Sequence, residues 1–256
     1  MPAVEFSTKQ PVKTGADQVT RRSGSLLWLV MLDLSGVLRV PDASWIRVQL
    51  ARVGLTRSEL AVRRAHYRAI SAFDQAVVTD HKTAYRETYP AAFLDALSLP
   101  SQLRSAVRTV LFDGGFNIGR QTADAASVAV AHALAAAGAM VVVVTNAATP
   151  GASRAWLAGV GLVPRDHGGP VTAVIDSSEV GVAKPDPAIL HLALAAAGWN
   201  DHDLQRVAFV GDSLRLDGEA ARRAGLRFLH FDPLRECPEP AHGHLQRLAG
   251  LLELTR

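Results

Sequence analysis

Four separated apolar runs constrain the fold of this chain most strongly, because each of them leads into polar residues suited to chemistry. The runs lead into Asp33, Thr145, Lys184 and Asp212. A buried parallel strand is a short, continuous apolar or β-branched run, and ligands bind beyond the carboxyl ends of such strands. We therefore expect Asp33, Thr145 and Asp212 at one edge of a parallel sheet, and we expect the chemistry of the protein there.

A regular alternation of strands and helices begins at about Thr122. After a first strand at about 26–32, strands are expected at 140–144, 171–175, 207–210 and 227–231, and helices at 122–137, 151–159, 187–197, 217–224 and 241–253. Glycines such as Gly138 and Gly225 end several of these helices. Strands separated by helices of this length predict a parallel sheet with right-handed crossovers, and hence an α/β fold.

The block between the first strand and this alternation has a helical pattern. Helices are expected at 43–53, 56–73, 82–97 and 100–112, the second of them opened by a capping box at Thr56-Arg-Ser-Glu59 and the last ended by the Asp113-Gly114-Gly115 turn. No strand of the parallel sheet is expected in it. The predicted organisation is a loose N-terminal tail at 1–24, an α/β core at 25–38 and 116–256, and an inserted all-helical subdomain at 39–115.

Composition excludes several classes of function. The chain has 256 residues and a net charge of +3, with no basic stripe interleaved with aromatic residues, so no nucleic-acid partner is expected. The apolar run at 26–32 is far shorter than the ~20 residues of a membrane span, and it meets Asp33 directly. Cys237 is the sole cysteine, which excludes a disulfide framework and fits a cytoplasmic protein.

The polar residues at the strand ends suggest a phosphoryl chemistry. Asp33 and Asp212 on adjacent strand tips can share Mg²⁺, which prefers carboxylates, phosphate oxygens and water. A carboxylate can also attack phosphorus and form an acyl phosphate. Thr145 offers a hydroxyl at a strand-to-helix turn for phosphate oxygens, and Lys184 offers a point charge. Asp217 fits a supporting role, in which it orients Lys184 or a metal-bound water.

These residues stand in four motifs that resemble those of the haloacid dehalogenase (HAD) superfamily. The motifs are Asp33-x-Ser35-Gly-Val-Leu, Thr145-Asn146 after an apolar run, Lys184-Pro-Asp-Pro, and Gly211-Asp212-Ser-x-x-x-Asp217, in family order over about residues 26–232. The resemblance implies a Rossmann-like core with a helical cap inserted after the first strand. It also implies that Asp33 is the nucleophile, that Thr145, Asn146 and Lys184 hold the phosphoryl group, and that Mg²⁺ is bound by Asp33, the Ser35 carbonyl, Asp212 and Asp217.

Ser35 is where this chain departs from the phosphatases it resembles, which carry an aspartate there as the general acid and base. Losing a positioned acid or base commonly costs about 10²–10⁴-fold in rate. Three consequences remain open: a substrate whose leaving group needs no proton, another residue that transfers the proton, or a slow or retired enzyme that only binds. A phosphonate hydrolase using Lys82 as a Schiff base, or a haloacid dehalogenase, is the further alternative, but the retained metal carboxylates favour phosphorus.

Other polar residues have plainer interpretations. His66 and Tyr67 could line a substrate pocket in the cap, but a solvated helix face is the expected account. His242 and His244, two residues apart at the start of a helix, are not expected to face one another or to bind a metal. The segment His230-Phe231-Asp232 could approach the rim of the site, although polarity flanking the core explains it as well.

The sequence therefore predicts a cytoplasmic, Mg²⁺-dependent hydrolase of a small phosphorylated metabolite, either a monomer or a homodimer. A catalytically weak relative kept for binding a ligand or a partner is the alternative from a different class. Arg39, close to the nucleophile loop, could meet an anionic substrate, and Trp45 could pack the cap onto the core.

Overall fold

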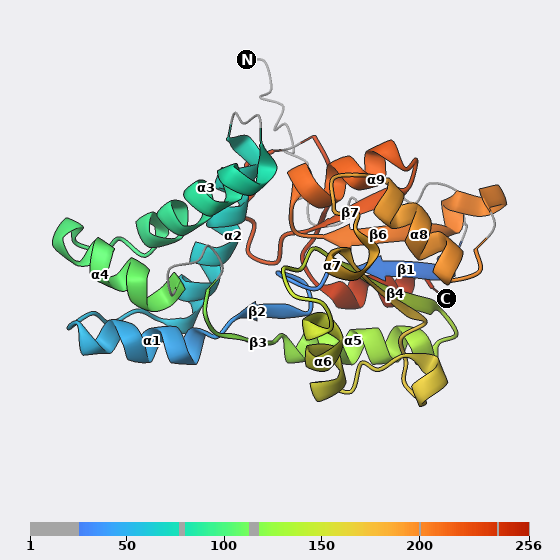
Figure 1. Cartoon of the computed structure of the whole chain (residues 1–256), viewed down its shortest axis with the longest axis horizontal. Coiled ribbons are helices and arrows are strands. Elements are labelled where there is room, and N and C mark those ends of the chain that lie inside the picture. The colour runs from blue at the N-terminus through green and yellow to red at the C-terminus, as the bar shows by residue number, and fades with distance from the viewer. Residues whose placement is uncertain (1–25, 77–79, 113–117, 200, 240, 256) are drawn as a thin grey trace, which may run out of the picture.

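The computed structural model describes residues 26–76, 80–112, 118–199, 201–239 and 241–255. Within these ranges the chain forms an α/β core beside a helical insertion, and the two parts are joined near the middle of the molecule (Figure 1). The predicted fold class is confirmed. The expected tail at 1–24 and the expected turn at Asp113-Gly114-Gly115 lie outside the described residues, and the exact domain boundaries stay a prediction.

The core is built on a six-stranded parallel sheet with the order β5-β4-β1-β6-β7-β8. Its strands are β1 (Leu29–Leu32), β4 (Met140–Thr145), β5 (Ala173–Asp176), β6 (Val207–Gly211), β7 (Arg227–Phe231) and β8 (His244–Leu245). Every residue of the central strand β1 is fully buried, as a continuous apolar run predicts. Because β1 pairs with both β4 and β6, the ends of these three strands lie side by side.

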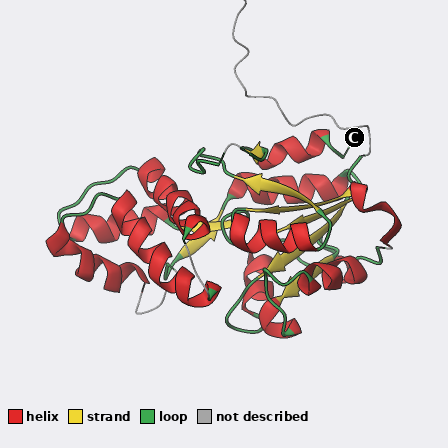
Figure 2. Cartoon of the chain, turned by 90° about the horizontal axis from the view of Figure 1, so that it is seen from above, coloured by secondary structure: helices red, strands yellow, loops and turns green. Residues whose placement is uncertain are grey.

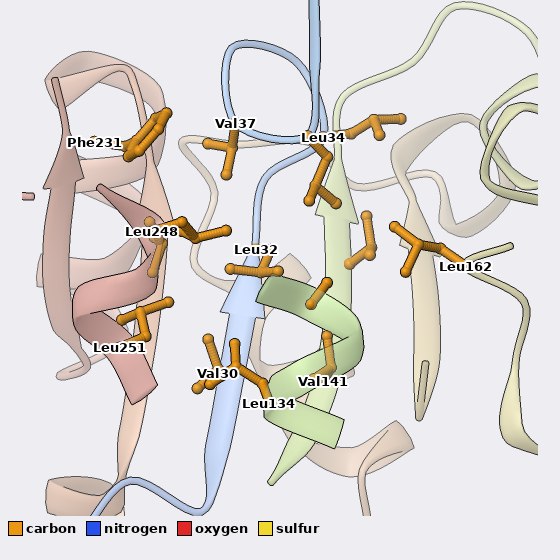
Figure 3. Packing of buried hydrophobic residues seen from close by; sticks show 14 of the residues in the cluster. Val30, Leu32, Leu34, Val37, Leu134, Val141, Leu162, Phe231, Leu248 and Leu251 are labelled. Carbon is orange, nitrogen blue, oxygen red and sulfur yellow. The ribbon is translucent and has the colours of Figure 1, made fainter. Parts of the chain in front are cut away.

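Helices cover both faces of this sheet. The helices α5 (Ala125–Ala136) and α6 (Ala152–Gly159) lie on one side, and α8 (Ala188–Ala196) and α9 (Glu219–Arg223) on the other (Figures 1 and 2). Alternate side chains of β1 point to opposite faces. Val30 and Leu32 therefore pack with Leu134 of α5 (Figure 3), whereas Leu29 and Met31 join the cluster on the other face.

The insertion between β1 and β4 contains four helices with a core of their own. They are α1 (Ala43–Arg52), α2 (Glu59–Gln75), α3 (His81–Ala96) and α4 (Ser101–Phe112). Their shared cluster includes the fully buried rings of Phe93 and Phe112, and Trp45 packs against this cluster. The short strand β2 (Arg39–Pro41) pairs antiparallel with β3 (Gln121–Ala123), so it joins the start of the insertion to its end.

Several local expectations were wrong because non-local pairing decided the structure. Residues 121–123 are extended against β2, so the helix expected from 122 begins only after Asp124, which caps α5. The expected final helix at 241–253 is instead β8, paired with β7, followed by a 3₁₀ helix at Leu248–Glu253. The cap of α2 is Ser58, not Thr56, because the Ser58 hydroxyl accepts the Ala61 N–H.

The remaining elements are short. A π-helical turn at Leu214–Gly218 precedes α9, where a single helix over 217–224 was expected. The others are α7 (Ser177–Val180) and the 3₁₀ helices Arg165–His167 and Asp201–Arg206. Among the described residues, no helix has the length and apolar character that a membrane crossing requires.

Candidate active site

Three buried carboxylates meet at the carboxyl edge of the sheet. Asp33 follows β1, and Asp212 follows β6, the strand paired with it; Asp217 lies in the turn after β6. One carboxylate oxygen from each of the three lies within 4.8 Å of the others. Gly211 permits this approach, because a side chain at that position would collide with Asp217. The structure thus brings together the acidic residues that the motifs singled out.

Lys184 lies among these carboxylates. Its Nζ is 2.7 Å from Asp33 Oδ1 and 2.7 Å from Asp217 Oδ1, and it also donates to the Val144 carbonyl at 3.2 Å. Asp33 Oδ1 accepts a second hydrogen bond, from the Leu34 N–H at 2.7 Å. Two donors therefore fix one oxygen of Asp33, and no described residue donates to the other oxygen, Oδ2.

Burial disfavours the charged forms of Asp33, Asp212 and Lys184. Burial raises the pKa of Asp33 to about 7, although the ammonium group of Lys184 opposes the shift. Burial also raises the pKa of Asp212, with the charge of Asp217 acting in the same direction. Burial alone would lower the pKa of Lys184, but Asp217 and Asp33 reverse this and hold the pKa above its usual range. Lys184 is thus a permanent cation facing an excess of negative charge.

Thr145 and Asn146 end the neighbouring strand β4. The Thr145 side chain is buried at the sheet edge. The Asn146 amide forms two bonds with the backbone of Lys184: its Nδ2 donates to the Lys184 carbonyl, and its Oδ1 accepts the Lys184 N–H, both at 2.9 Å. Asn146 therefore positions the lysine segment and keeps one amide hydrogen for another acceptor. Its contact with a phosphoryl group stays a prediction.

The Ser35 side chain is hydrogen-bonded by Arg39, four residues further along the chain. The Ser35 Oγ accepts a hydrogen bond from Arg39 Nη2 at 3.0 Å, and the Arg39 guanidinium lies 5.6 Å from the centre of the Trp156 ring. Gly36, between them, has a φ of +77° and packs so closely against Asp212 that any side chain there would collide with the carboxylate. The loop is therefore built tightly around the carboxylate cluster.

His66 and Tyr67 are not on a solvated helix face, so that interpretation was wrong. Both are buried, at 5% and 4% exposure, where α2 meets the core. His66 Nε2 lies 3.4 Å from Asp212 Oδ2, and the Tyr67 hydroxyl donates to the Gly36 carbonyl at 2.8 Å. Burial, with the charge of Arg63 adding to it, lowers the pKa of His66 to about 3, so this imidazole is neutral.

Asp74, at the end of α2, also contacts the site and was not among the residues predicted from the sequence. Its carboxylate accepts hydrogen bonds from the Ser213 hydroxyl at 2.6 Å and from the backbone N–H groups of Leu214 and Arg215 at 2.7 and 3.1 Å. Asp74 thus fastens the insertion to the turn that follows Asp212. The available signal was helical spacing, because Tyr67 and Asp74 are seven residues apart on one face of α2.

We expect Asp74 to make the stability of the protein depend on pH. Burial raises the pKa of Asp74 to about 7, against the pull of the hydrogen bond from Ser213. An aspartate in the unfolded chain has a pKa near 3.9. The contribution of Asp74 to the stability of the fold is therefore complete below about pH 4, and it is lost as the pH rises through 7. The free energy of unfolding of the wild type, relative to Asp74→Asn, should fall by about 2–3 kcal/mol between pH 5 and 8. Urea titrations of both proteins test this, and a difference independent of pH would contradict it.

The interpretation of His242 and His244 was also wrong. Their rings stack with centroids 4.5 Å apart, because residues 244–245 form β8 and not a helix. His230, at the end of β7, lies opposite His244 in the register, and its Nε2 is 3.0 Å from the Asp212 carbonyl oxygen. Lys82 lies in α3, and its side chain is outside the described residues, so the phosphonate alternative receives no support from it.

Three buried carboxylates and a lysine meet at the carboxyl edge of the parallel sheet, beside a helical insertion. The sequence matches the family described as haloacid dehalogenase-like hydrolase over residues 29–225, and the chain belongs to this family. It is 35% identical over 105 residues to the phosphoserine phosphatase of Thermus thermophilus, a match that takes in 41% of this chain and spans only 39% of that relative's length.

Two solved structures show the same fold. One is the HAD phosphatase from Thermococcus onnurineus, at 17% identity and a TM-score of 0.53, over 89% of this chain and 97% of that one. The other is the HAD-hydrolase YfnB from Bacillus subtilis bound to magnesium, at 15% identity and a TM-score of 0.51, over 90% of this chain and 99% of that one.

Proposed function

We propose that this protein is a Mg²⁺-dependent phosphatase that hydrolyses a small phosphorylated metabolite through a phosphoryl group carried on Asp33. The observation that supports this most directly is the hydrogen bonding of the two Asp33 carboxylate oxygens. Lys184 and the Leu34 N–H fix Oδ1, whereas Oδ2 receives no hydrogen bond from any described residue. A nucleophile held at one oxygen and open at the other is oriented for in-line attack on phosphorus.

The carboxylate cluster fits Mg²⁺. Asp33, Asp212 and Asp217 offer hard oxygen ligands within 4.8 Å of one another, which suits a cation that binds through carboxylates and water. Asp212 Oδ2 is buried and accepts no hydrogen bond from the described residues. When bound, Mg²⁺ supplies positive charge beside the phosphoryl oxygens. The Ser35 carbonyl is the further ligand that the family resemblance implies.

The side chains of the chain itself account for the rest of the reaction. Lys184 neutralises Asp33 and the incoming phosphoryl oxygens together, and Asp217 holds the ammonium group in place. Thr145 supplies a hydroxyl to a phosphoryl oxygen, and Asn146 positions Lys184. The helix α2 covers the site through Tyr67 and Asp74, which limits water until the second step.

The proposed substrate class is supported by the similarity to a phosphoserine phosphatase. The partial match to a phosphoserine phosphatase supports a phosphate monoester of low molecular weight, although it spans too little of that relative to name the substrate. The direct test is phosphate release from a panel of phosphorylated metabolites, with Mg²⁺ and with a chelator. We expect release that requires Mg²⁺, and equal release in both conditions would reject the proposal.

A catalytically weak binding protein is the second candidate, and Ser35 is the observation that favours it. The Ser35 hydroxyl is already engaged by Arg39, and it is not a proton-transfer group near neutral pH. Under this alternative the cluster would still bind Mg²⁺ and phosphate, but turnover would be slow for every substrate.

Replacing Ser35 by aspartate separates the two candidates. Ser35→Asp should raise kcat/KM by at least about tenfold, because a positioned acid or base contributes about 10²–10⁴-fold. The gain should be larger for an alkyl phosphate than for an aryl phosphate, whose leaving group needs no proton. Ser35→Asn is the matched control, because it has the size of aspartate without its proton transfer. No gain over the Asn variant would favour the binding protein.

A further inference from the structure

A second cluster of metal-ligating side chains lies beside the carboxylates and takes no part in the proposed reaction. One ligand atom from each of His230, Cys237, His242 and His244 lies within 4.8 Å of the others. His230 and His244 are placed by the pairing of β7 with β8, where they stand opposite each other. Cys237 and His242 come from the segment that connects these two strands.

The distances within this cluster are close to those of a zinc site. His230 Nδ1 lies 2.8 Å from His242 Nε2, and His242 Nε2 lies 3.9 Å from Cys237 Sγ. Zinc binds nitrogen at about 2.0–2.1 Å and thiolate sulfur at about 2.3 Å, so tetrahedral ligands stand about 3.3–3.6 Å apart. The observed distances lie on either side of that range, and shifts of about half an ångström would bring the ligands to it.

Hydrogen bonds from outside the cluster orient two of the ligands. His230 Nε2 faces the Asp212 carbonyl, so Nε2–H donates to it and Nδ1 presents its lone pair to the cluster. The buried Asp232 carboxylate contacts His244 Nδ1 at 3.1 Å and accepts the Cys237 N–H at 3.0 Å. Metal-ligating histidines characteristically have such carboxylate or carbonyl partners.

Of the four residues, His244 is the least available for metal binding. Its Nε2 lies 3.2 Å from the Glu239 carbonyl, so this contact must open before that nitrogen can bind a metal. His230, Cys237 and His242 are therefore the three primary ligands, with His244 or water in the fourth position. Cys237 and His242 also line a cavity of about 470 Å³ between α2 and the connecting segment, which gives an ion access.

We propose that His230, Cys237, His242 and His244 form a Zn²⁺ site, distinct from the carboxylate cluster. Imidazole and thiolate ligands favour Zn²⁺ over Mg²⁺, and a coordinated thiol loses its proton to the solvent. The bound ion would fasten the segment between β7 and β8. It would also be linked to Asp212 through the hydrogen bond of His230.

The test uses untagged, chelator-treated protein and measures Zn²⁺ by competition with a chromophoric chelator. We expect one equivalent of Zn²⁺ in the wild type, and Co²⁺ in its place should give a thiolate-to-cobalt absorption band. Cys237→Ser should weaken Zn²⁺ binding at least about 100-fold and remove that band, and Asp232→Asn should weaken binding about 10–100-fold. His191→Ala is the matched control, because His191 is an exposed histidine on α8.

Three further measurements test the proposed Zn²⁺ site. Zn²⁺ should raise the Tm of the wild type and leave that of Cys237→Ser unchanged; if the serine variant does not fold, His242→Ala replaces it. Asp33→Asn should keep its Zn²⁺, so failure of the proposed phosphatase reaction would leave this site standing. Full Zn²⁺ affinity in the Cys237 or His242 variant, or loss of the ion in Asp33→Asn, would overturn the proposal.

Discussion

Replacing Lys184 by methionine should lower the free energy of unfolding by about 3–5 kcal/mol at pH 8, the usual loss when one partner of a buried ion pair is removed. The loss has a specific source. The ammonium group lies 2.7 Å from Asp33 and 2.7 Å from Asp217, and without it both carboxylates are buried with no counter-ion. Methionine has nearly the volume of the lysine stem, so a cavity contributes little. Denaturant unfolding followed by circular dichroism measures the change.

The pH dependence separates this charge effect from a packing effect. At pH 5 the unpaired Asp33 carboxylate of Lys184→Met can bind a proton, because burial raises its pKa. The destabilisation should therefore be clearly smaller at pH 5 than at pH 8. The double variant Lys184→Met/Asp217→Asn is the matched control, since it removes one of the stranded charges and should recover part of the loss. A loss that is equal at both pH values would show that packing, and not charge, is responsible.

The site residues that lie directly after a strand could be predicted from the sequence. Asp33 and Asp212 each follow a continuous apolar run, and parallel strands present their carboxyl ends at one edge. The sequence also suggested that Asp217 orients Lys184, and the structure has these two side chains in contact. These inferences need only the direction of each strand, which local pattern determines.

The residues contributed by the insertion could not be predicted in the same way. His66, Tyr67 and Asp74 lie on one face of α2, but the sequence of a helix does not say which face meets a distant strand end. That choice depends on how the insertion docks, and it is fixed by contacts about 140 residues apart, such as Asp74 with Leu214. A polar face on a helix is therefore compatible with both solvent and an active site until the docking is known.

The histidines near the C-terminus illustrate a second limit. The sequence predicts a helix over His242 and His244, in which residues two apart point in different directions. His244 instead pairs with β7 as part of β8, and His242 lies in the segment just before β8, where its ring stacks on that of His244. Whether a short segment pairs with a distant strand depends on the energy of the whole sheet, and a two-residue strand carries too little local pattern to reveal it.

Replacing Asp33 by asparagine should abolish Mg²⁺-dependent turnover, by at least about a thousandfold in kcat, because the amide cannot act as the nucleophile. The fold should survive the change. Asparagine keeps the oxygen that accepts from the Leu34 N–H, and Lys184 keeps its contact with Asp217. Because burial raises the pKa of Asp33 to about 7, the ionised side chain destabilises the fold at pH 8, and its removal should leave the stability unchanged or higher.

The matched control for this variant is Asp176→Asn, which alters another buried carboxylate at the same edge of the sheet. Asp176 stands opposite Thr145 in the register of β4 with β5, but it belongs to the cap of α7 and not to the carboxylate cluster. Its replacement should change kcat by less than about tenfold, in contrast to the loss expected of a reacting group. Mass spectrometry of quenched reactions adds a direct readout, because wild-type protein should carry a phosphoryl group that Asp33→Asn lacks. Turnover that survives in Asp33→Asn would mean that another residue is the nucleophile, and the attack assigned here to Asp33 would have to be abandoned.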